Sequence, residues 1–468
     1  MNPISPEQAA AWCRGRWHPR RPSGPLRALG VDSRRAGPGD LFFALKGGRA
    51  DGHDFLAAVA AAGACAVVRA ELPVGQLPAA GGFLRVDDVL AALGRCAAGY
   101  RTTVSARVVG VTGSVGKTST KELVADALAM AGKTARTAGN FNNEIGLPLS
   151  VAGLDGDCAF GVIEAGISHP GEMAALRDIL MPDIAVMTRI GPAHIEFFAS
   201  VRAIAEEKAA LLEKLPADGF AVLDRDDEFF EVLRAHSSAP VVTCSMKRRE
   251  ADYAGDPQAD GHLWVFERAT GESAMLPVPP PGAYMAENAL RAVAVARRCG
   301  VPWDALASAL DRSRPVGMRW AVEDVGGWTA VNDGYNANPM SMRAALGAFA
   351  NRPARGRRFL ALGTMLELGR LEQAEHEALG RDVAGGGWGG VAVVPWQRAD
   401  GAEDAGAQAL LAGLRAGGWP AEQLCAAGGP AEAAAWLRAR LRPGDALLLK
   451  ASRGVRIEKI LEELRKEG

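Results

Sequence analysis

The sequence predicts an α/β protein of three domains, and three observations carry that prediction. The chain has 468 residues, too many for one hydrophobic core when a domain averages about 150 residues. From residue 102 to about 314, short apolar segments alternate with helical patterns, which predicts a mostly parallel sheet. After residue 314 the composition changes and a second alternating series begins. The expected domains are therefore residues 1–101, 102–314 and 315–468.

Residues 1–101 predict a small α/β domain. A helical pattern at 5–12 precedes a buried strand at 41–45, and helix and strand signals follow at 55–62 and 64–69. The loops of this domain carry three polar residues of interest, Ser33, Arg34 and Lys46. Polar residues of this kind occur both in ordinary surface turns and in sites for phosphorylated ligands. The residues alone leave both alternatives open.

The central domain begins with a glycine-rich segment between a strand and a helix. The segment Thr112-Gly-Ser-Val-Gly-Lys-Thr118 follows Ala106-Arg-Val-Val109, which reads as the end of a strand, and precedes a helical pattern at 121–130. Unpaired backbone N–H groups at such a helix start bind anions. Lys117 would reach the β- and γ-phosphates, and the Thr118 hydroxyl would hold Mg²⁺. Val111 stands where the strict eight-residue pattern has glycine, but the shorter pattern is intact and predicts nucleoside triphosphate binding.

Three further candidates lie on the same edge of the predicted sheet. Glu164 ends an apolar strand at 160–166, and His194 follows a strand at 183–188. Ligands of open α/β sheets bind outside the carboxyl ends of the strands, so both side chains should lie beside the phosphate loop. A lone histidine is often structural, and Lys208, in a helical pattern at 203–215, would ordinarily be a solvated residue. Their functional and structural interpretations both stay open at this stage.

Composition excludes several classes of function. The formal net charge of -1 and the pI near 6.7 give no electrostatic basis for binding nucleic acid. The first residues lack a secretory pattern, and the longest apolar run, 56–68, is too short for a membrane span. Seven cysteines are scattered without a Cys-x-x-Cys pair, which is typical of free thiols. We therefore expect a cytoplasmic protein without membrane insertion.

The C-terminal domain predicts a doubly wound sheet. Strands are expected at 328–332, 358–363, 390–394 and 445–450, with helices between them. The first strand runs into Asp333-Gly-Tyr-Asn-Ala-Asn-Pro339. This domain has no glycine fingerprint of its own, so we expect it to complete a nucleotide site together with the central domain.

These motifs together resemble the Mur ligases, the ATP-dependent amide-forming enzymes of peptidoglycan precursor synthesis. The phosphate-loop segment marks the superfamily. Three segments resemble its D-alanyl-D-alanine-adding branch: Gly139-Asn-Phe-Asn-Asn-Glu-Ile-Gly-Leu-Pro148, Asn332-Asp-Gly-Tyr-Asn-Ala-Asn-Pro339 and Leu362-Gly-Thr-Met-Leu-Glu-Leu-Gly369. Residues 32–53 are similar to the family's UDP-sugar-binding domain, which favours a substrate role for Ser33 and Arg34. The resemblance covers essentially the whole chain and implies a UDP-substrate domain, an ATPase domain and a Rossmann-like C-terminal domain.

The resemblance also implies roles for individual residues. As catalytic residues it implies Lys117, Glu164, His194 and Lys208, the last matching a lysine that some relatives carry as a carbamate. As Mg²⁺ ligands it implies Thr118, Glu164 and His194. The ATP-binding residues would be Gly113, Ser114, Val115, Gly116, Lys117, Thr118, Ser119, Asn288, Arg319 and Asp333. The substrate-binding residues would be Ser33, Arg34, Lys46, Asn140, Asn142, Asn143, Tyr335, Asn336, Ser452 and Arg453.

The implied activity joins D-alanyl-D-alanine to a UDP-N-acetylmuramoyl-tripeptide, with ATP and Mg²⁺, in a monomer. Two residues depart from the family pattern: Thr364 stands where this branch commonly has Asp, and Ala210 where an acid often follows the matching lysine. Two other functions are alternatives for a chain with this phosphate loop. One is a different Mur-type ligase, such as a folylpolyglutamate synthase, and the other is a phosphate-loop regulatory ATPase. The sequence leaves open whether the third residue of the tripeptide is lysine or diaminopimelate.

Overall fold

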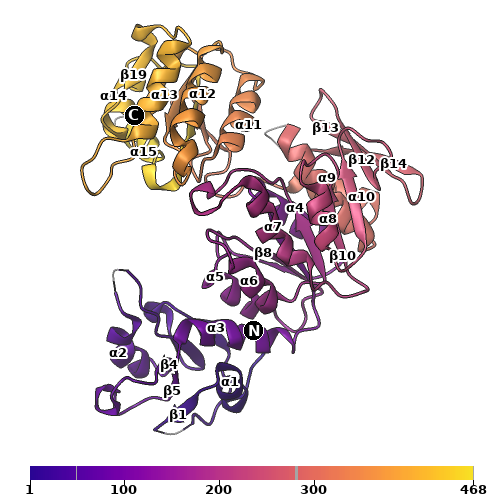
Figure 1. Ribbon diagram of the computed structural model, residues 1–468, viewed down its shortest axis with the longest axis vertical. Coiled ribbons are helices and arrows are strands. Elements are labelled where there is room, and N and C mark those ends of the chain that lie inside the picture. Colours follow the sequence, from indigo (N-terminus) through magenta and orange to yellow (C-terminus); the bar gives the residue numbers. More distant parts are fainter. Residues whose placement is uncertain (20, 49, 280–282, 467–468) are drawn as a thin grey trace.

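Three β-sheets follow one another along the chain. The computed structural model of the protein describes residues 1–466 except 20, 49 and 280–282. Within them the sheets have five, nine and six strands, and Figure 1 shows them as three lobes, coloured indigo, magenta to salmon, and orange to yellow. A mixed α/β fold with three sheets confirms the predicted fold class. The domain limits at 101/102 and 314/315 fall between the sheets and stay predictions.

The first lobe is a small sheet in the order β1-β5-β4-β3-β2, with β1 antiparallel to β5 and the other pairs parallel. Its strands are β1 (Arg16–His18), β2 (Ala28–Gly30), β3 (Asp40–Phe43), β4 (Cys65–Arg69) and β5 (Phe83–Val86), and its helices are α1 (Pro6–Cys13), α2 (Leu56–Ala61) and α3 (Val89–Arg101). Ser5 begins α1 by accepting a hydrogen bond from the backbone N–H of Gln8, as an N-cap serine does. Buried residues of α3 join the first and second lobes in one hydrophobic core.

The second lobe has the strand order β14-β13-β12-β11-β10-β9-β6-β8-β7. Its strands are β6 (Arg107–Thr112), β7 (Thr134–Arg136), β8 (Phe160–Glu164), β9 (Ile184–Met187), β10 (Phe220–Asp224), β11 (Val241–Ser245), β12 (Tyr253–Pro257), β13 (His262–Glu267) and β14 (Glu272–Pro277). The strands from β7 to β12 are parallel, and β6 and β10 are almost wholly buried, as expected with helices on both faces. The antiparallel meander β12-β13-β14 was not predicted; burial alternates along β13, which leaves one side of it half-exposed.

The helices of the second lobe are α4 (Lys117–Leu128), α5 (Gly146–Ala152), α6 (Glu172–Leu180), α7 (Val201–Ala209), α8 (Phe230–His236), α9 (Ala283–Arg298) and α10 (Trp303–Arg312). Helix α4 packs on α9 and α10. Strand β6 lies between β9 and β8. The phosphate loop after β6, His194 after β9 and Glu164 at the end of β8 therefore meet at one edge of the sheet. None of the helices in the described part of the chain is long and apolar enough to cross a bilayer.

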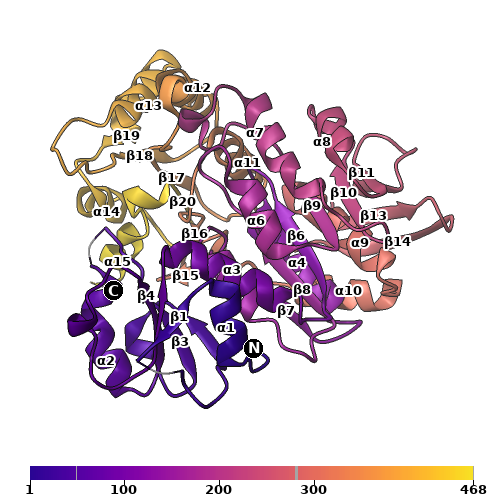
Figure 2. The same ribbon diagram turned by 60° about the horizontal axis from the view of Figure 1, so that its bottom comes forward.

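The third lobe has the strand order β15-β16-β20-β17-β18-β19. Its strands are β15 (Ala321–Val325), β16 (Trp328–Asn332), β17 (Arg358–Gly363), β18 (Gly390–Val394), β19 (Leu424–Ala426) and β20 (Ala446–Lys450), and its helices are α11 (Pro339–Ala350), α12 (Glu372–Ala384), α13 (Ala405–Ala416), α14 (Pro430–Arg438) and α15 (Lys459–Arg465). Among the described strands of this sheet, only β15 is antiparallel to its neighbour. Figure 2 shows this lobe beside the second one, with α11 between them.

Candidate active site

A cavity of about 880 Å³ lies between the second and third lobes. Its walls come from the phosphate loop and α6 on one side and from the segment after β16 and the end of β20 on the other. Fourteen of the predicted site residues line it: Ser114, Val115, Gly116, Lys117, Thr118, Ser119, Asn142, Asn143, Glu164, His194, Arg319, Asp333, Tyr335 and Asn336. Lys450 lines the same cavity, more than 300 positions after Ser114 in the sequence.

The two glycines of the phosphate loop are required by its close packing. Gly113 and Gly116 have φ angles of 147° and 90°, a region that side chains disfavour. A Cβ atom on Gly113 would lie 1.9 Å from Oγ1 of Thr188, and one on Gly116 would lie 2.8 Å from Oδ1 of Asn288. The loop is also fixed to the segment after β9, because the N–H of Ser114 donates to the carbonyl of Arg189 at 2.8 Å. The loop is thereby held at the N-terminus of α4, where backbone N–H groups favour an anion.

Glu164 lies at the centre of a small hydrogen-bonded group. Its Oε2 accepts from Oγ1 of Thr118 at 2.7 Å, and its Oε1 accepts from Nδ2 of Asn142 at 2.7 Å. Its backbone N–H donates to Oγ1 of Thr137 at 3.0 Å. The residue is 1% exposed, so the surrounding atoms restrict the orientation of its carboxylate. A buried carboxylate beside a hydroxyl fits Mg²⁺, which prefers oxygen ligands.

The protein alone offers few ligands for such an ion. Among the described residues there is no group of three or more His, Cys, Asp or Glu side chains placed to hold a metal. Mg²⁺ in nucleotide sites is usually bound through one or two protein oxygens together with substrate phosphates and water. Thr118 and Glu164 fit that kind of site.

Two lysines lie in or near the phosphate loop. Nζ of Lys117 donates to the carbonyl of Gly113 at 2.8 Å and to that of Ser114 at 3.4 Å. Burial lowers the pKa of Lys117, Glu164 opposes that shift, and the charge of Arg319 adds to it. Lys208, on α7, is 1% exposed rather than solvated.

Burial, and next the charge of Lys117, lower the pKa of Lys208 well below its ordinary value of 10.5. The carboxylates of Glu207, Glu164 and Glu172 act in the opposite direction. Lys208 does not line the cavity, but it lies within the electrostatic field of the phosphate site.

His194 contacts the third lobe. Its Nδ1 lies 2.5 Å from Oε2 of Glu367, in the loop after β17. That hydrogen bond is the largest cause of a lowered pKa of Glu367, and the partial burial of the carboxyl acts against it. Glu367 was not predicted as a site residue. It lies in the segment 362–369, which resembles the D-alanyl-D-alanine-adding branch, and nothing local to it indicates a partner in another domain.

The third lobe provides a polar wall with two paired cations. The guanidinium carbon of Arg319 lies 3.7 Å from the ring centroid of Tyr335, a cation–π contact. Nζ of Lys450 donates to Oδ2 of Asp333 at 2.6 Å, and all four residues line the cavity. Lys450 was missed in the sequence; the signal was a lysine closing the apolar strand 445–450, at a strand end that faces the site.

Besides Gly113 and Lys208, seven predicted residues do not line this cavity, and their roles stay predictions. Ser33, Arg34 and Lys46 belong to the first lobe, where the Arg34 guanidinium lowers the pKa of Asp32 to about 2. Asn140 lies on the loop before α5, and Arg453 pairs with Glu458 at 2.8 Å. Ser452 and Asn288 are each 3% exposed. Ser452 accepts from the N–H of Leu366 at 2.9 Å, and Asn288 accepts from Oγ1 of Thr120 at 3.1 Å.

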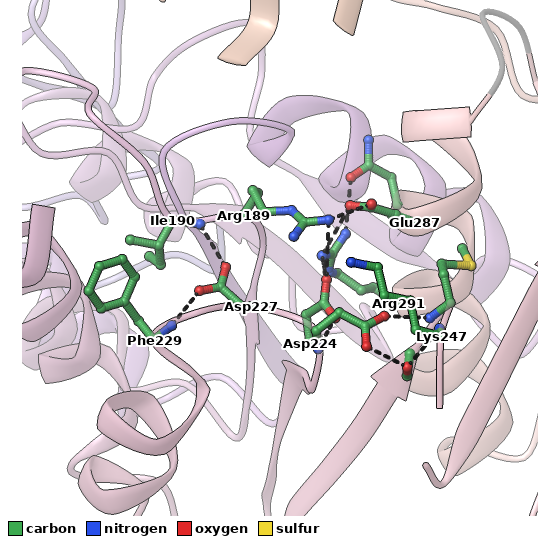
Figure 3. Close-up of polar contacts among 12 residues, drawn as sticks. Arg189, Ile190, Asp224, Asp227, Phe229, Lys247, Glu287 and Arg291 are labelled. Carbon is green, nitrogen blue, oxygen red and sulfur yellow. Dashed lines mark hydrogen bonds and ion pairs between the residues drawn. The ribbon is translucent and has the colours of Figure 1, made fainter. Parts of the chain in front are cut away.

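Oδ1 of Asn288 accepts from Nη1 of Arg291 at 3.5 Å. Arg291 belongs to a partly buried group of charged residues, which Figure 3 shows. Arg291 pairs with Asp224 at 2.7 Å, and Arg189 pairs with Glu287 at 2.5 Å. Asp227, whose pKa is raised by burial, accepts from the N–H of Ile190 at 3.1 Å. Because the carbonyl of Arg189 accepts from the phosphate loop, this group anchors the loop to α9 and β10.

Comparisons with known proteins agree with this geometry. Three family models match the chain: Mur ligase family, catalytic domain, at 25–101; Mur ligase middle domain at 111–296; and Mur ligase, glutamate ligase domain, at 318–453. The UDP-N-acetylmuramoyl-tripeptide–D-alanyl-D-alanine ligase of Synechocystis sp. is 35% identical over 445 residues, which cover 94% of this chain and 92% of the relative.

Two solved structures are similar over most of their length. A crystal structure of MurF from Acinetobacter baumannii matches with a TM-score of 0.86 and 27% identity, covering all of both chains. MurF ligase from Thermotoga maritima in complex with ADP matches with a TM-score of 0.79 and 28% identity, covering 94% of this chain and 98% of that one. The chain belongs to the Mur ligase family, in the group formed by these D-alanyl-D-alanine ligases.

Proposed function

We propose that this chain is an ATP-dependent ligase that joins D-alanyl-D-alanine to a UDP-N-acetylmuramoyl-tripeptide and so supplies the pentapeptide precursor of peptidoglycan. The observation that carries the proposal is the shared cavity. It brings the phosphate loop, a buried carboxylate and the polar wall of the third lobe into one space of about 880 Å³. A relative with that name is 35% identical along nearly the whole chain.

The chemistry follows from what amide synthesis requires. A carboxylate is a poor electrophile, so an oxygen of the terminal carboxylate first attacks the γ-phosphorus of ATP, and ADP leaves. The amine of D-alanyl-D-alanine then attacks the acyl carbon, the bond to the phosphate oxygen breaks, and the nitrogen loses a proton. Negative charge gathers around the transferred group, where Lys117 and the N-terminus of α4 stabilise it.

Mg²⁺, held by oxygens of Thr118 and Glu164 and by His194 together with the nucleotide, would neutralise phosphate charge in this site. The protein's own part is to hold those two oxygens together, since the Thr118 hydroxyl already contacts Glu164. Asn142 restrains the other carboxylate oxygen. This arrangement limits the reorganisation that ion binding requires.

The cavity between lobes also protects the intermediate. An acyl phosphate hydrolyses readily, so water must be kept away from it while the second substrate binds. Walls from two lobes allow the site to close by movement of one lobe on the other. We propose that the enzyme acts as a monomer in the cytoplasm, with the first lobe holding the UDP portion through Ser33, Arg34 and Lys46.

ADP release tests the proposal. Purified protein with ATP and Mg²⁺ should release ADP only when a UDP-muramoyl-tripeptide and D-alanyl-D-alanine are both present. Lysine-containing and diaminopimelate-containing tripeptides, compared side by side, identify the natural substrate. ADP release driven by glutamate and a folate, or hydrolysis stimulated by a protein partner without any UDP-sugar, would contradict it.

A further inference from the structure

We infer that Glu367 is a positioning residue for His194, so that the orientation of this histidine depends on docking of the third lobe against the second. The inference rests on the proposed function and deepens it. It assigns a role to a residue of the third lobe that does not itself line the cavity. Glu367 would therefore act through His194 and not on substrate.

The contact joins two loops that belong to different sheets. His194 lies after β9, and Glu367 lies after β17. Besides the 2.5 Å contact between Nδ1 and Oε2, the N–H of Glu196 donates to the carbonyl of Glu367 at 3.2 Å. Nη2 of Arg370 donates to the carbonyl of Ala199 at 2.6 Å. The side-chain pair is thus part of a docked surface made of residues 194–199 and 367–370.

The backbone of both partners is held in an unusual conformation. His194 and Glu367 have φ angles of 56° and 63°, two of the six non-glycine residues with positive φ in the described chain. Such conformations cost energy and persist where the surroundings enforce them, often at functional sites. Gly369 allows the loops to approach, since a Cβ atom there would lie 3.0 Å from Cα of Glu196.

The loop that carries Glu367 is itself fixed. The N–H of Met365 donates to Nε2 of His376 at 2.9 Å, and the N–H of Leu366 donates to Oγ of Ser452 at 2.9 Å. Met365 and Leu368 are buried. The carboxylate is therefore presented by a rigid part of the third lobe, which is what a positioning residue requires.

The chemical consequence concerns the two ring nitrogens. A carboxylate accepts hydrogen bonds and donates none, so Nδ1 of His194 carries the proton in this contact. Nε2 then has a free lone pair, and it has no hydrogen-bond partner in the part of the chain that the structure describes. His194 lines the cavity. A carboxylate–histidine pair of this type fixes the ring and presents its second nitrogen to a divalent cation.

The test compares three variants with a probe cation. Mn²⁺ binding is measured by electron paramagnetic resonance in the presence of a non-hydrolysable ATP analogue. Glu367→Ala should weaken Mn²⁺ binding by about tenfold or more, the usual effect of removing such a partner. Glu367→Gln keeps an acceptor oxygen and should stay within about threefold of wild type. Glu375→Ala, which removes a carboxylate paired with Arg343 in the same lobe, is the matched control and should bind as wild type does.

A second readout is independent of how well the alanine variant folds. Long-range ¹H–¹⁵N spectra of the wild-type protein, with His194→Ala to assign the signal, should show the proton of His194 on Nδ1. A proton on Nε2 in wild type would overturn the inference, as would unchanged Mn²⁺ binding in Glu367→Ala or an equal loss in Glu375→Ala. Failure of the wild type to release ADP with both substrates would instead contradict the proposed function, whatever Glu367→Ala does.

Discussion

The hydroxyl of Thr118 donates to Oε2 of Glu164 at 2.7 Å, across 46 positions of sequence. One group comes from the first turn of α4 and the other from the last residue of β8, and both lie at the same edge of the second sheet. The two oxygens that we assign to Mg²⁺ are thus adjacent before any ligand arrives. Several expected outcomes depend on this arrangement.

Lys117→Ala should lower the rate of ADP release by about 10²-fold or more, because it removes a charge that stabilises the transferred phosphoryl group. Folding should be unaffected, since within the described residues the ammonium donates hydrogen bonds only to carbonyls of its own loop. Steady-state rates and thermal melting check both parts. Lys133→Ala, which removes an exposed lysine paired with Asp157, is the control. A Lys117→Ala enzyme with more than about a tenth of wild-type rate would refute this assignment.

Glu164→Gln should weaken nucleotide binding when Mg²⁺ is present and change it little when the ion is chelated. Glutamine keeps the shape of the side chain but removes the negative charge that favours a divalent cation. Titration of ADP with and without Mg²⁺ measures the difference. Glu206→Gln, a surface carboxylate paired with Arg202, should behave as wild type. The same dependence on Mg²⁺ in Glu164→Gln and wild type would make Glu164 a bystander.

Thr364→Val should stay within a few-fold of wild-type activity and lose stability. The hydroxyl of Thr364 is fully buried and donates to Asp404, the N-cap of α13. Losing a hydrogen bond to a charged group costs about 1.5–3 kcal/mol, so the melting temperature should fall by several degrees. Thr364→Ser should restore it. A collapse of the rate at unchanged stability would reveal a direct catalytic role instead.

Lys208→Ala should be nearly inactive, and a short carboxylate in the buffer should partly restore activity. Burial and the charge of Lys117 lower the pKa of Lys208, which raises the fraction of neutral amine at a given pH. A neutral amine reacts with carbon dioxide to give a carbamate, an oxygen ligand of the kind Mg²⁺ prefers. Mass spectrometry under carbon dioxide detects the adduct. Lys214→Ala, an exposed lysine paired with Asp178, is the control, and normal activity of Lys208→Ala would disprove the role.

Local pattern predicted most of the fold. Strands β17 and β18 were expected with the bounds that the structure has, because each is an apolar run between turn signals. The meander β12-β13-β14 was missed because its pairing is set by cross-strand partners such as Tyr253 and Glu267, which no local pattern specifies. The same limit explains Glu367, whose partner His194 is 173 positions away.

The residues of the candidate site also divide into those that a local pattern predicts and those that it does not. The phosphate loop and Glu164 could be predicted because a strand end and a helix start fix their direction. Burial could not be predicted: the pattern around Lys208 is equally consistent with a solvated face, and only the packing of α7 makes that residue 1% exposed. That Asp333 and Arg319 line the same cavity as the phosphate loop was implied by the resemblance, since no pattern local to Arg319 indicates a distant cavity.

The most direct measurement of the central claim follows oxygen from the tripeptide. A UDP-N-acetylmuramoyl-tripeptide labelled with ¹⁸O in its terminal carboxylate is incubated with ATP, Mg²⁺ and D-alanyl-D-alanine, and the released phosphate is analysed by mass spectrometry. An acyl-phosphate route predicts one ¹⁸O atom in each phosphate released and one in the new amide. Unlabelled phosphate, or label in AMP, would contradict the account.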